Sequence, residues 1–475
     1  MSESEYDVII IGAGAVAENV ADRAVRGGLT AVLIESELVG GECSYWACMP
    51  SKALLRSGIA LRAAQNVEGT KQAVTGGLDV AAVLKRRDSF THDWDDQSQV
   101  DWVAGAGIGL IRGHGRITGA KTVSVEKDGE FTQLTARHAV VVSTGSDPVL
   151  PDIPGLADVN PWTPREATSA KVIPKSLAII GGGVVAVEMA TAYASFGSEV
   201  TVMARSGLLG GQEDFAGEMV GEALEKLGVK IIHAAPSVVS RDTVITVTVD
   251  GHSFEAEELL VATGRQPRTT DIGLETVGLE PGTWIDVDDT LLARSDTNSG
   301  TGWLYATGDV NHRALLTHQG KYQARAAGDV IAARALGKPV SDQKWGAHVA
   351  TADIQAVPQV TFSDPEVASV GLTSKAAEEA GFDIRVVDYD LGWVAGASLQ
   401  ADGYAGKARM VVDEKRKVIV GVTFVGQDVS ELIHAATIAI VGEVPLDRLW
   451  HAVPAYPTMN EVWLRLLESY RGGGA

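Results

Sequence analysis

The chain of 475 residues carries a formal net charge of -21, and 45% of its residues are hydrophobic. A chain of this length is too long for one hydrophobic core, so we expect two or three domains. The acidic excess argues against nucleic acid or an anionic membrane as a partner, because phosphate binding requires a basic surface. The amino terminus has no basic segment, and its apolar run stops at Gly12. This fits neither a signal peptide nor a membrane span, so a cytoplasmic protein is expected.

Residues 6–35 have the pattern of a strand, a glycine turn, a helix and a second strand. Such a βαβ unit is typical of dinucleotide binding. Gly12 would form the tight turn, Gly14 would let the backbone approach a pyrophosphate, and Ala17 stands where a small residue packs the helix on the strand. Glu35, at the end of the second strand, can accept hydrogen bonds from ribose hydroxyls. The segment predicts a first dinucleotide site.

Both cysteines of the chain, Cys43 and Cys48, lie in the segment GGECSYWACMPSK, residues 40–52. Two cysteines cannot form the disulfide framework of a secreted domain, which leaves chance, metal binding or redox chemistry. The spacing, the two preceding glycines and the following Pro-Ser-Lys resemble the active-site motif of the pyridine nucleotide-disulfide oxidoreductases, the family of dihydrolipoamide dehydrogenase, glutathione reductase and mercuric reductase. The alternative, two inert buried cysteines, leaves the flanking motif unexplained.

The resemblance implies FAD in the first dinucleotide site. In this family electrons pass from a nicotinamide cofactor through the flavin to a disulfide, which becomes a thiol and a thiolate. By position, Cys48 is the thiolate next to the flavin, and Cys43 is the interchange thiol that attacks the substrate. Lys52 and the helix that begins near Pro50 would lower the thiol pKa.

Helices are expected over residues 52–65 and 79–95, followed by a set of short strands. Residues 138–145 and 259–264 each have the pattern of a strand that returns to a glycine turn. Further cofactor contacts are expected at Gly41, Lys52, Gly115, Thr144, Gly145 and Gly264.

The dinucleotide pattern returns in residues 176–205, where Gly181, Gly183 and Ala186 occupy the turn and the start of the helix. One glycine turn can join a strand to a helix and bind nothing, but two copies in complete βαβ units predict two dinucleotides. The second unit ends at Arg205 rather than at an acidic residue. Arginine can bind a 2'-phosphate, so NADPH is favoured over NADH.

The segment WLYATGDV, residues 303–310, resembles the second flavin motif of the family and gives Asp309 a role at the FAD ribityl and phosphate region. Residues 358–371, with Phe362, Pro365 and Glu366, resemble the opening of the dimerisation domain. A homodimer with an active site shared between subunits is therefore implied.

The predicted fold is α/β, with two Rossmann-like domains and a carboxyl-terminal α+β dimerisation domain. Their predicted bounds are 1–155 with 270–342 for FAD, 156–269 for NAD(P), and 345–475 for the interface.

Glu188 follows the second glycine turn at the position where similar enzymes carry a glutamate near the nicotinamide. The resemblance implies an ion pair between Glu188 and Lys52. The alternative is a solvated residue on the surface of a helix.

The carboxyl-terminal segment, Tyr456 to Glu461, departs from the family pattern. Disulfide reductases of the family have histidine, the acid-base catalyst, where this chain has Tyr456. A tyrosine with an ordinary pKa of about 10 stays protonated at neutral pH and is a poor general base. Glu461 would orient Tyr456 or shape the interface pocket, and alternatively Tyr456 only fills the subunit interface. His451 does not match the catalytic position and is interpreted as structural.

Mercuric reductases resemble the chain at Tyr456 and at residues 200–206, and soft cations such as Hg(II) or Cu(II) suit thiolates. The expected function is electron transfer from NADPH through FAD and the dithiol to a small-molecule acceptor: a disulfide, a soft metal ion or a quinone. No resident metal site is predicted. A dihydrolipoamide dehydrogenase of a 2-oxo acid dehydrogenase complex is the alternative enzyme, and a non-catalytic redox sensor is the alternative class.

Overall fold

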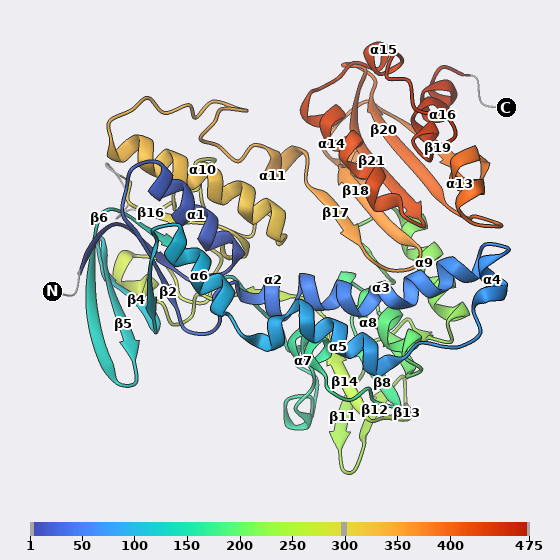
Figure 1. Cartoon of the computed structure of the whole chain (residues 1–475), viewed down its shortest axis with the longest axis horizontal. Helices are drawn as coiled ribbons and strands as arrows, with labels where there is room; N and C mark the ends of the chain where they lie inside the picture. The colour runs from blue at the N-terminus through green and yellow to red at the C-terminus, as the bar shows by residue number, and fades with distance from the viewer. Residues whose placement is uncertain (1–3, 296–301, 473–475) are drawn as a thin grey trace. The chain divides into compact units, whose positions relative to one another are not determined.

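The computed structural model describes residues 4–295 and 302–472, and it has the predicted α/β architecture (Figure 1). The chain divides into two compact units, each described here by itself. The first unit comprises residues 1–50, 88–149 and 265–354, and the second comprises 51–87, 150–264 and 355–475. Residues 156–264 of the predicted NAD(P) segment and residues 355–475 of the predicted interface segment belong to the second unit, and the division into three domains remains a prediction.

A seven-stranded sheet forms the core of the first unit, in the order β3-β2-β1-β6-β5-β4 with β16 also paired to β6. The strands β3, β2, β1, β6 and β16 are parallel, whereas β4 and β5 continue from β6 as an antiparallel meander. The central strands are continuous apolar runs because both faces of the sheet are buried. The strands are β1 (Glu5–Ile11), β2 (Ala31–Glu35), β3 (Gly109–Arg112), β4 (His114–Gly119), β5 (Thr122–Lys127), β6 (Glu130–Val142) and β16 (Leu304–Ala306).

Two long helices of the first unit, α1 (Ala15–Arg26) and α10 (Thr317–Ala335), lie against each other (Figure 1). Glycines allow this close approach. A Cβ added at Gly320 would lie 2.5 Å from Val16 Cγ2, and one at Gly328 would lie 2.5 Å from Arg23 Cβ. The contact fixes the amino terminus of α10 relative to the first glycine turn. The remaining elements of this unit include α2 (Gly41–Tyr45), α6 (Gln97–Gly105), β7 (Ser146–Pro148), β15 (Arg265–Pro267), η3 (Leu274–Val277) and η5 (Asp309–Asn311).

The second unit contains the other predicted βαβ segment and a separate antiparallel sheet. A parallel sheet of order β10-β9-β8-β14 carries the second glycine turn, and a three-stranded sheet β11-β12-β13 packs nearby in the same unit. These strands are β8 (Ser176–Ile180), β9 (Glu199–Met203), β10 (Lys230–Ile232), β14 (Glu258–Val261), β11 (Val238–Arg241), β12 (Ile245–Val249) and β13 (His252–Ala256). The helices are α4 (Thr70–Ala73), α7 (Pro164–Ser169), α8 (Val184–Ser195) and α9 (Asp214–Lys226).

The carboxyl-terminal part of the second unit is an antiparallel sheet of order β17-β18-β21-β20-β19 covered by helices. The strand β21 is buried along its whole length, so it forms the centre of this core. The strands are β17 (Pro358–Thr361), β18 (Glu366–Gly371), β19 (Ile384–Asp390), β20 (Lys407–Asp413) and β21 (Val418–Gly426). The helices are α12 (Ser374–Glu379), α13 (Ala395–Gln400), α14 (Ile433–Val441), α15 (Leu446–Leu449) and α16 (Glu461–Tyr470).

Two helix boundaries differ from the prediction. Helix α3 (Cys48–Gln65) begins before residue 52 and therefore includes the second cysteine. The helix expected over residues 79–95 ends as α5 (Val80–Phe90). It ends there because His92, Asp93 and Trp94 have positive φ values of 50°, 53° and 60°, which an α-helix does not allow.

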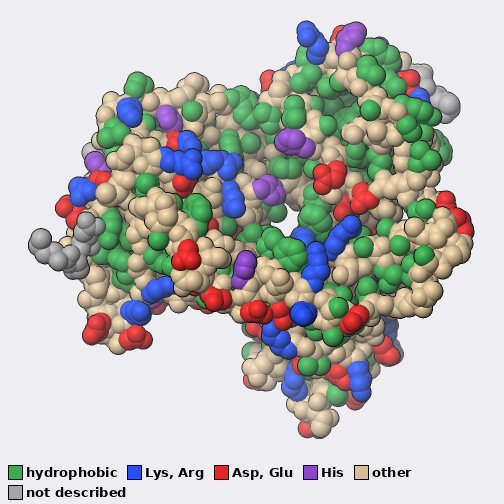
Figure 2. Space-filling model, in the orientation of Figure 1, with side chains coloured by type: hydrophobic (Ala, Val, Ile, Leu, Met, Phe, Trp, Pro, Cys, Tyr) green, Lys and Arg blue, Asp and Glu red, His purple; other side chains and the backbone are tan. Residues whose placement is uncertain are grey.

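Within the described ranges, no helix combines the length and the apolar character needed to cross a membrane. On the face shown in Figure 2, acidic and basic side chains are interspersed in small groups. The net charge of -21 is thus not gathered into one patch on this face.

Candidate functional site

The first glycine turn has the shape that a dinucleotide requires. Gly12 has a φ of +103°, and a Cβ at this position would lie 2.4 Å from the Ser143 carbonyl oxygen. Gly14 precedes α1 in an extended conformation, and a Cβ on Gly41 would lie 2.9 Å from its Cα. The carboxylate of Glu35 accepts a hydrogen bond of 2.7 Å from the Ala13 amide. A bare backbone beside a helix amino terminus is the usual site for a pyrophosphate, so these residues fit FAD.

Asp309 lies at the start of η5, directly after Gly308 with its φ of +79°. Its Oδ2 accepts a hydrogen bond of 2.5 Å from Ser146 Oγ and lies 3.7 Å from Arg265 Nε. These contacts hold the carboxylate in one orientation. The carboxylate can then meet a polar group of FAD, as the resemblance implies.

The other predicted FAD contacts occupy two different environments. Thr144 donates a hydrogen bond of 2.7 Å to the Arg268 carbonyl, and Gly145 has a φ of +77°. Gly115 is buried in β4, and a Cβ there would lie 3.2 Å from the side chains of Ile11 and Ile34. Packing of the sheet thus accounts for a glycine at residue 115, and its contact with a cofactor remains a prediction.

The cysteine pair lies where α2 and α3 meet, with Cys43 in α2 and Cys48 at the first residue of α3. Both are free thiols and are partly buried. The Sγ atom of Cys48 lies 3.4 Å from Oγ1 of Thr317, the first residue of α10. A hydrogen bond to Cys48, together with burial, raises the pKa of Cys43, and Thr317 and the Lys321 ammonium act in the opposite direction. The Cys43 thiol beside Cys48 is therefore harder to deprotonate than an isolated cysteine.

Lys52 and Glu188 form the ion pair that the resemblance implies. Lys52 Nζ donates to both carboxylate oxygens of Glu188, at 3.0 and 2.8 Å. Glu188 is only 3% exposed, so the interpretation as a solvated surface residue is wrong. The amide of Phe362 donates a further hydrogen bond of 3.0 Å to the same carboxylate.

The second glycine turn repeats the geometry of the first. Gly181 has a φ of +128°, and a Cβ there would lie 2.2 Å from the Ala262 carbonyl oxygen. Gly183 directly precedes α8, and Ala186 is fully buried under the helix. Gly264 follows β14 in the open turn after Thr263. The backbone thus leaves room for a second dinucleotide.

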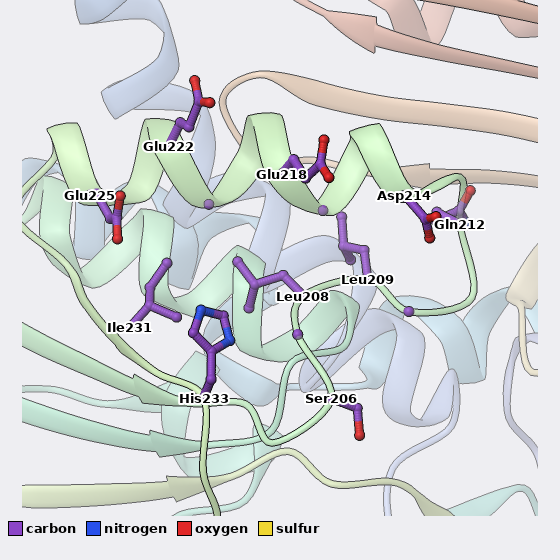
Figure 3. Close-up of a pocket in the computed structure, with 14 residues that line it drawn as sticks. Ser206, Leu208, Leu209, Gln212, Asp214, Glu218, Glu222, Glu225, Ile231 and His233 are labelled. Atoms are coloured by element: carbon purple, nitrogen blue, oxygen red, sulfur yellow. The ribbon is translucent and has the colours of Figure 1, made fainter.

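A pocket of about 490 Å³ is lined by Ser206, the residue directly after Arg205, and by residues of α9 (Figure 3). Arg205 is exposed and forms no ion pair within residues 4–295 and 302–472. Figure 3 shows carboxylates of α9, among them Glu218 and Glu222, along one wall, with His233 on the opposite side. The lining along α9 is thus acidic, and the exposed Arg205 precedes the first lining residue in the sequence.

The structure does not bring Tyr456 and Glu461 together within one subunit. Tyr456 is 75% exposed. Glu461 is buried at the start of α16, where Oε1 accepts a hydrogen bond of 2.7 Å from Arg465. Its Oε2 has no hydrogen-bond partner among the described residues. His451 is exposed.

Sequence reasoning missed three residues that the structure places at these centres: Thr317, Lys321 and Phe362. Thr317 and Lys321 come from a helix more than 260 residues after the cysteine segment, and no local motif signals such a contact. Phe362 had a place only in the predicted dimerisation motif.

Two dinucleotide-binding turns and a cysteine pair in one chain are the architecture of enzymes that move electrons between a nucleotide and a disulfide. Residues 6–328 match the family model of the pyridine nucleotide-disulphide oxidoreductases, and residues 357–466 match the model of their dimerisation domain. The chain therefore belongs to the pyridine nucleotide-disulphide oxidoreductase family and is an oxidoreductase. The family depends on FAD and a pyridine nucleotide, and the dimerisation domain indicates a homodimer.

Relatives of two kinds align over almost the whole chain. A mercuric reductase of Staphylococcus aureus is 31% identical over 97% of this chain and 81% of its own length. A dihydrolipoyl dehydrogenase of Halobacterium salinarum is 31% identical over 98% of this chain and 96% of its own length. The Cu(II) complex of the flavoprotein disulfide reductase RclA from Escherichia coli has the same fold, with a TM-score of 0.82, 23% identity, and coverage of 98% of this chain and 99% of that one.

Proposed function

We propose that this enzyme uses NADPH and bound FAD to reduce the Cys43–Cys48 disulfide, and that the dithiol then reduces a soft metal ion such as Hg(II) or Cu(II). The observation that carries the proposal is the contact of Cys48 with Cys43 and with Thr317. It gives the chain a paired-thiol centre with a polar neighbour that can stabilise a thiolate. As the dithiol closes to the disulfide, it releases two protons and two electrons, and the electrons reduce one Hg(II) ion or two Cu(II) ions.

Different residues of this chain would bind each part of the two cofactors. The turn around Gly12 and Gly14 would hold the FAD pyrophosphate, Glu35 the ribose, and Asp309 the ribityl and phosphate region. When bound, FAD supplies the two-electron link between the nicotinamide and the disulfide. Lys52 and Glu188 would lie at the nicotinamide, with Gly181 and Gly183 at its pyrophosphate and Gly264 in the following turn.

The tyrosine at position 456 bears on whether the acceptor is a disulfide or a soft metal ion. Reduction of a disulfide needs a proton for the departing thiolate, whereas reduction of a metal ion does not. The histidine that disulfide reductases of the family carry at this position exchanges protons near neutral pH, and a tyrosine is a weaker catalyst of that transfer. This favours a soft metal ion over a disulfide, and a quinone is the remaining acceptor class.

A dihydrolipoamide dehydrogenase is the second candidate. Its support is the relative of that name in Halobacterium salinarum, 96% of whose length aligns. Rapid NAD-linked oxidation of dihydrolipoamide, abolished by Cys43→Ser, would favour this candidate over the first. A redox sensor would instead bind flavin and reduce no acceptor.

The test is an anaerobic NADPH titration of the purified protein, followed by visible spectroscopy and repeated on Cys48→Ser. A thiolate in contact with the flavin is expected to give a long-wavelength absorption band in the wild type that Cys48→Ser lacks. Turnover with Hg(II), Cu(II), lipoamide and a quinone then ranks the acceptors. If the flavin absorbance is lost in both proteins and neither develops a new band, the cysteines take no part in the electron transfer. This result would contradict the proposal. The same titration with NADH tests the assignment of Arg205 to the 2'-phosphate.

A further inference from the structure

We propose that Phe362 is a positioning residue that holds the Lys52–Glu188 pair from the segment that opens the dimerisation domain. Phe362 directly follows β17 and belongs to the dimerisation-domain match, whereas Lys52 and Glu188 lie on α3 and α8. All three residues belong to the second unit.

The first contact is made by the backbone. Glu188 is almost completely buried, and its Oε1 accepts hydrogen bonds of 3.0 Å from both Lys52 Nζ and the Phe362 amide. The ladder between β17 and β18 ends at Thr361, so this amide is not needed by the sheet. A buried carboxylate without enough donors is costly, and the Phe362 amide supplies a donor that does not depend on a side-chain rotamer.

The second contact is made by the ring. Lys52 Nζ lies 4.9 Å from the centroid of the Phe362 ring. A lysine side chain has many rotamers, and an ammonium over an aromatic face is attracted by the ring quadrupole. The ring therefore favours the one rotamer in which Lys52 reaches Glu188.

The same short segment joins α3 and α8 at a second point. Arg62, near the end of α3, donates a hydrogen bond to Asp364 and another of 2.8 Å to Ser195 Oγ, at the last residue of α8. The helices are close at this end, because a Cβ on Gly58 would lie 2.8 Å from Ser195 Oγ. Residues 362–364 thus tie the two helices together at the Lys52–Glu188 end and at the Arg62 end. The dimerisation domain thereby sets the geometry of a pair that the nucleotide-binding segments supply.

The test compares Phe362→Leu with Phe362→Tyr in the purified holoenzyme. Leucine keeps the amide and removes the ring, whereas tyrosine keeps both. The readout is the labelling of Lys52 by an amine-reactive reagent, quantified by mass spectrometry with Lys226 as the internal reference. We expect Phe362→Leu to increase the labelling of Lys52 about fivefold, the effect of losing one cation–π contact, and Phe362→Tyr to match the wild type.

Asp364→Asn is the matched control, because it weakens the Arg62 end and leaves both contacts of Phe362 intact. Its Lys52 labelling should stay at the wild-type level. Wild-type labelling in Phe362→Leu, or an equal increase in Phe362→Leu and Asp364→Asn, would overturn the proposal, since the second result indicates general loosening of the helices. If Phe362→Leu does not fold, Phe362→Met removes the ring at similar volume and is judged by the same criteria.

A kinetic readout follows, which rests on the proposed function. In single-turnover mixing with NADPH, Phe362→Leu should slow flavin reduction severalfold at an unchanged melting temperature, and Phe362→Tyr should restore the rate. Labelling needs no turnover, so a protein that NADPH cannot reduce would contradict the proposed function and still leave the role of Phe362 testable.

Discussion

Lys321 lies one helical turn after Thr317 on α10, and its ammonium opposes the effects that raise the pKa of Cys43. We expect Lys321→Met to raise the pKa of Cys43 further, because it removes the stabilising positive charge from the thiolate. The measurement is the pH dependence of iodoacetamide alkylation in the Cys48→Ser background. In that background Cys43 is the only thiol of the chain, so the midpoint reports on this residue alone.

Lys338, exposed just after the end of α10, supplies the control. Lys338→Met changes the net charge by the same amount and should leave the alkylation midpoint where it is. Lys321→Arg keeps the charge and should stay near the wild type. If Lys321→Met and Lys338→Met have the same midpoint, the field at Cys43 does not come from Lys321.

Burial makes the charged form of the Glu18 carboxyl group unfavourable. It is 8% exposed on α1, and burial raises its pKa from 4.5 to about 7. The folded state therefore binds this proton more tightly than the unfolded state does. Stability is lost as the pH rises from about 4.5 to about 7, and the full cost above that window is about 3 kcal/mol.

Glu18→Gln should remove that dependence. We expect the variant to be more stable than the wild type at about pH 8 by up to about 3 kcal/mol, with a much smaller difference at about pH 4.5. Denaturant unfolding at the two pH values gives the free energies, and the exposed Glu130→Gln is the control. A variant that is less stable at both pH values would mean that Glu18 has a partner that compensates its burial.

Local sequence predicted the residues whose chemistry follows from a motif. The positions of Cys43 and Cys48 and the ion pair of Lys52 with Glu188 came from the family resemblance. Contacts between distant segments could not be predicted in this way. Tertiary packing within the first unit brings the hydroxyl of Thr317 to Cys48, and packing within the second unit brings the ring of Phe362 to Lys52.

At the scale of the element, the first glycine turn combines backbone strain with a steric limit. Gly12 and Gly28 have similar φ values, +103° and +97°. Only Gly12 has a neighbour in the way, the Ser143 carbonyl oxygen at 2.4 Å from an added Cβ. The two glycines therefore separate the cost of strain from the cost of a clash.

We expect Gly28→Ala to lower the free energy of unfolding by about 1 kcal/mol and to keep FAD, because it adds only left-handed strain. Gly12→Ala should cost several kcal/mol more and lose most of the bound flavin, since the turn must open to admit the methyl group. Denaturant unfolding and the visible absorbance of the purified proteins measure the two effects. Full flavin content in Gly12→Ala would show that this turn is not the FAD cradle.

Both βαβ units could be predicted because their strands are continuous apolar runs, and glycines mark the turns. The end of α5 could not be predicted, because it depends on positive φ values at three residues that are not glycine, His92, Asp93 and Trp94. Propensity alone would continue the helix through His92 to Trp94.

At the scale of the whole molecule, the order of segments along the chain predicted the fold class, and pairing of distant strands completed it. The pairing of β16 with β6, for example, returns residues 304–306 to the first sheet after the whole nucleotide-binding segment of the second unit. The resemblance also implied the homodimer, which the dimerisation-domain match supports. The segment around Tyr456 would then act in the site of the other subunit.

Tyr456→His tests this shared site. Acid-base catalysis by a well-placed histidine contributes roughly 10²–10⁴-fold, so reduction of a disulfide such as lipoamide should rise by at least about tenfold. Reduction of a soft metal ion should change little, because that reaction needs no proton at this position. Steady-state assays with both acceptors measure the switch, with Tyr456→Phe as the control that removes only the hydroxyl. A histidine variant that gains no disulfide reduction, while its dimer remains intact by sedimentation, would mean that residue 456 does not reach the cysteine pair.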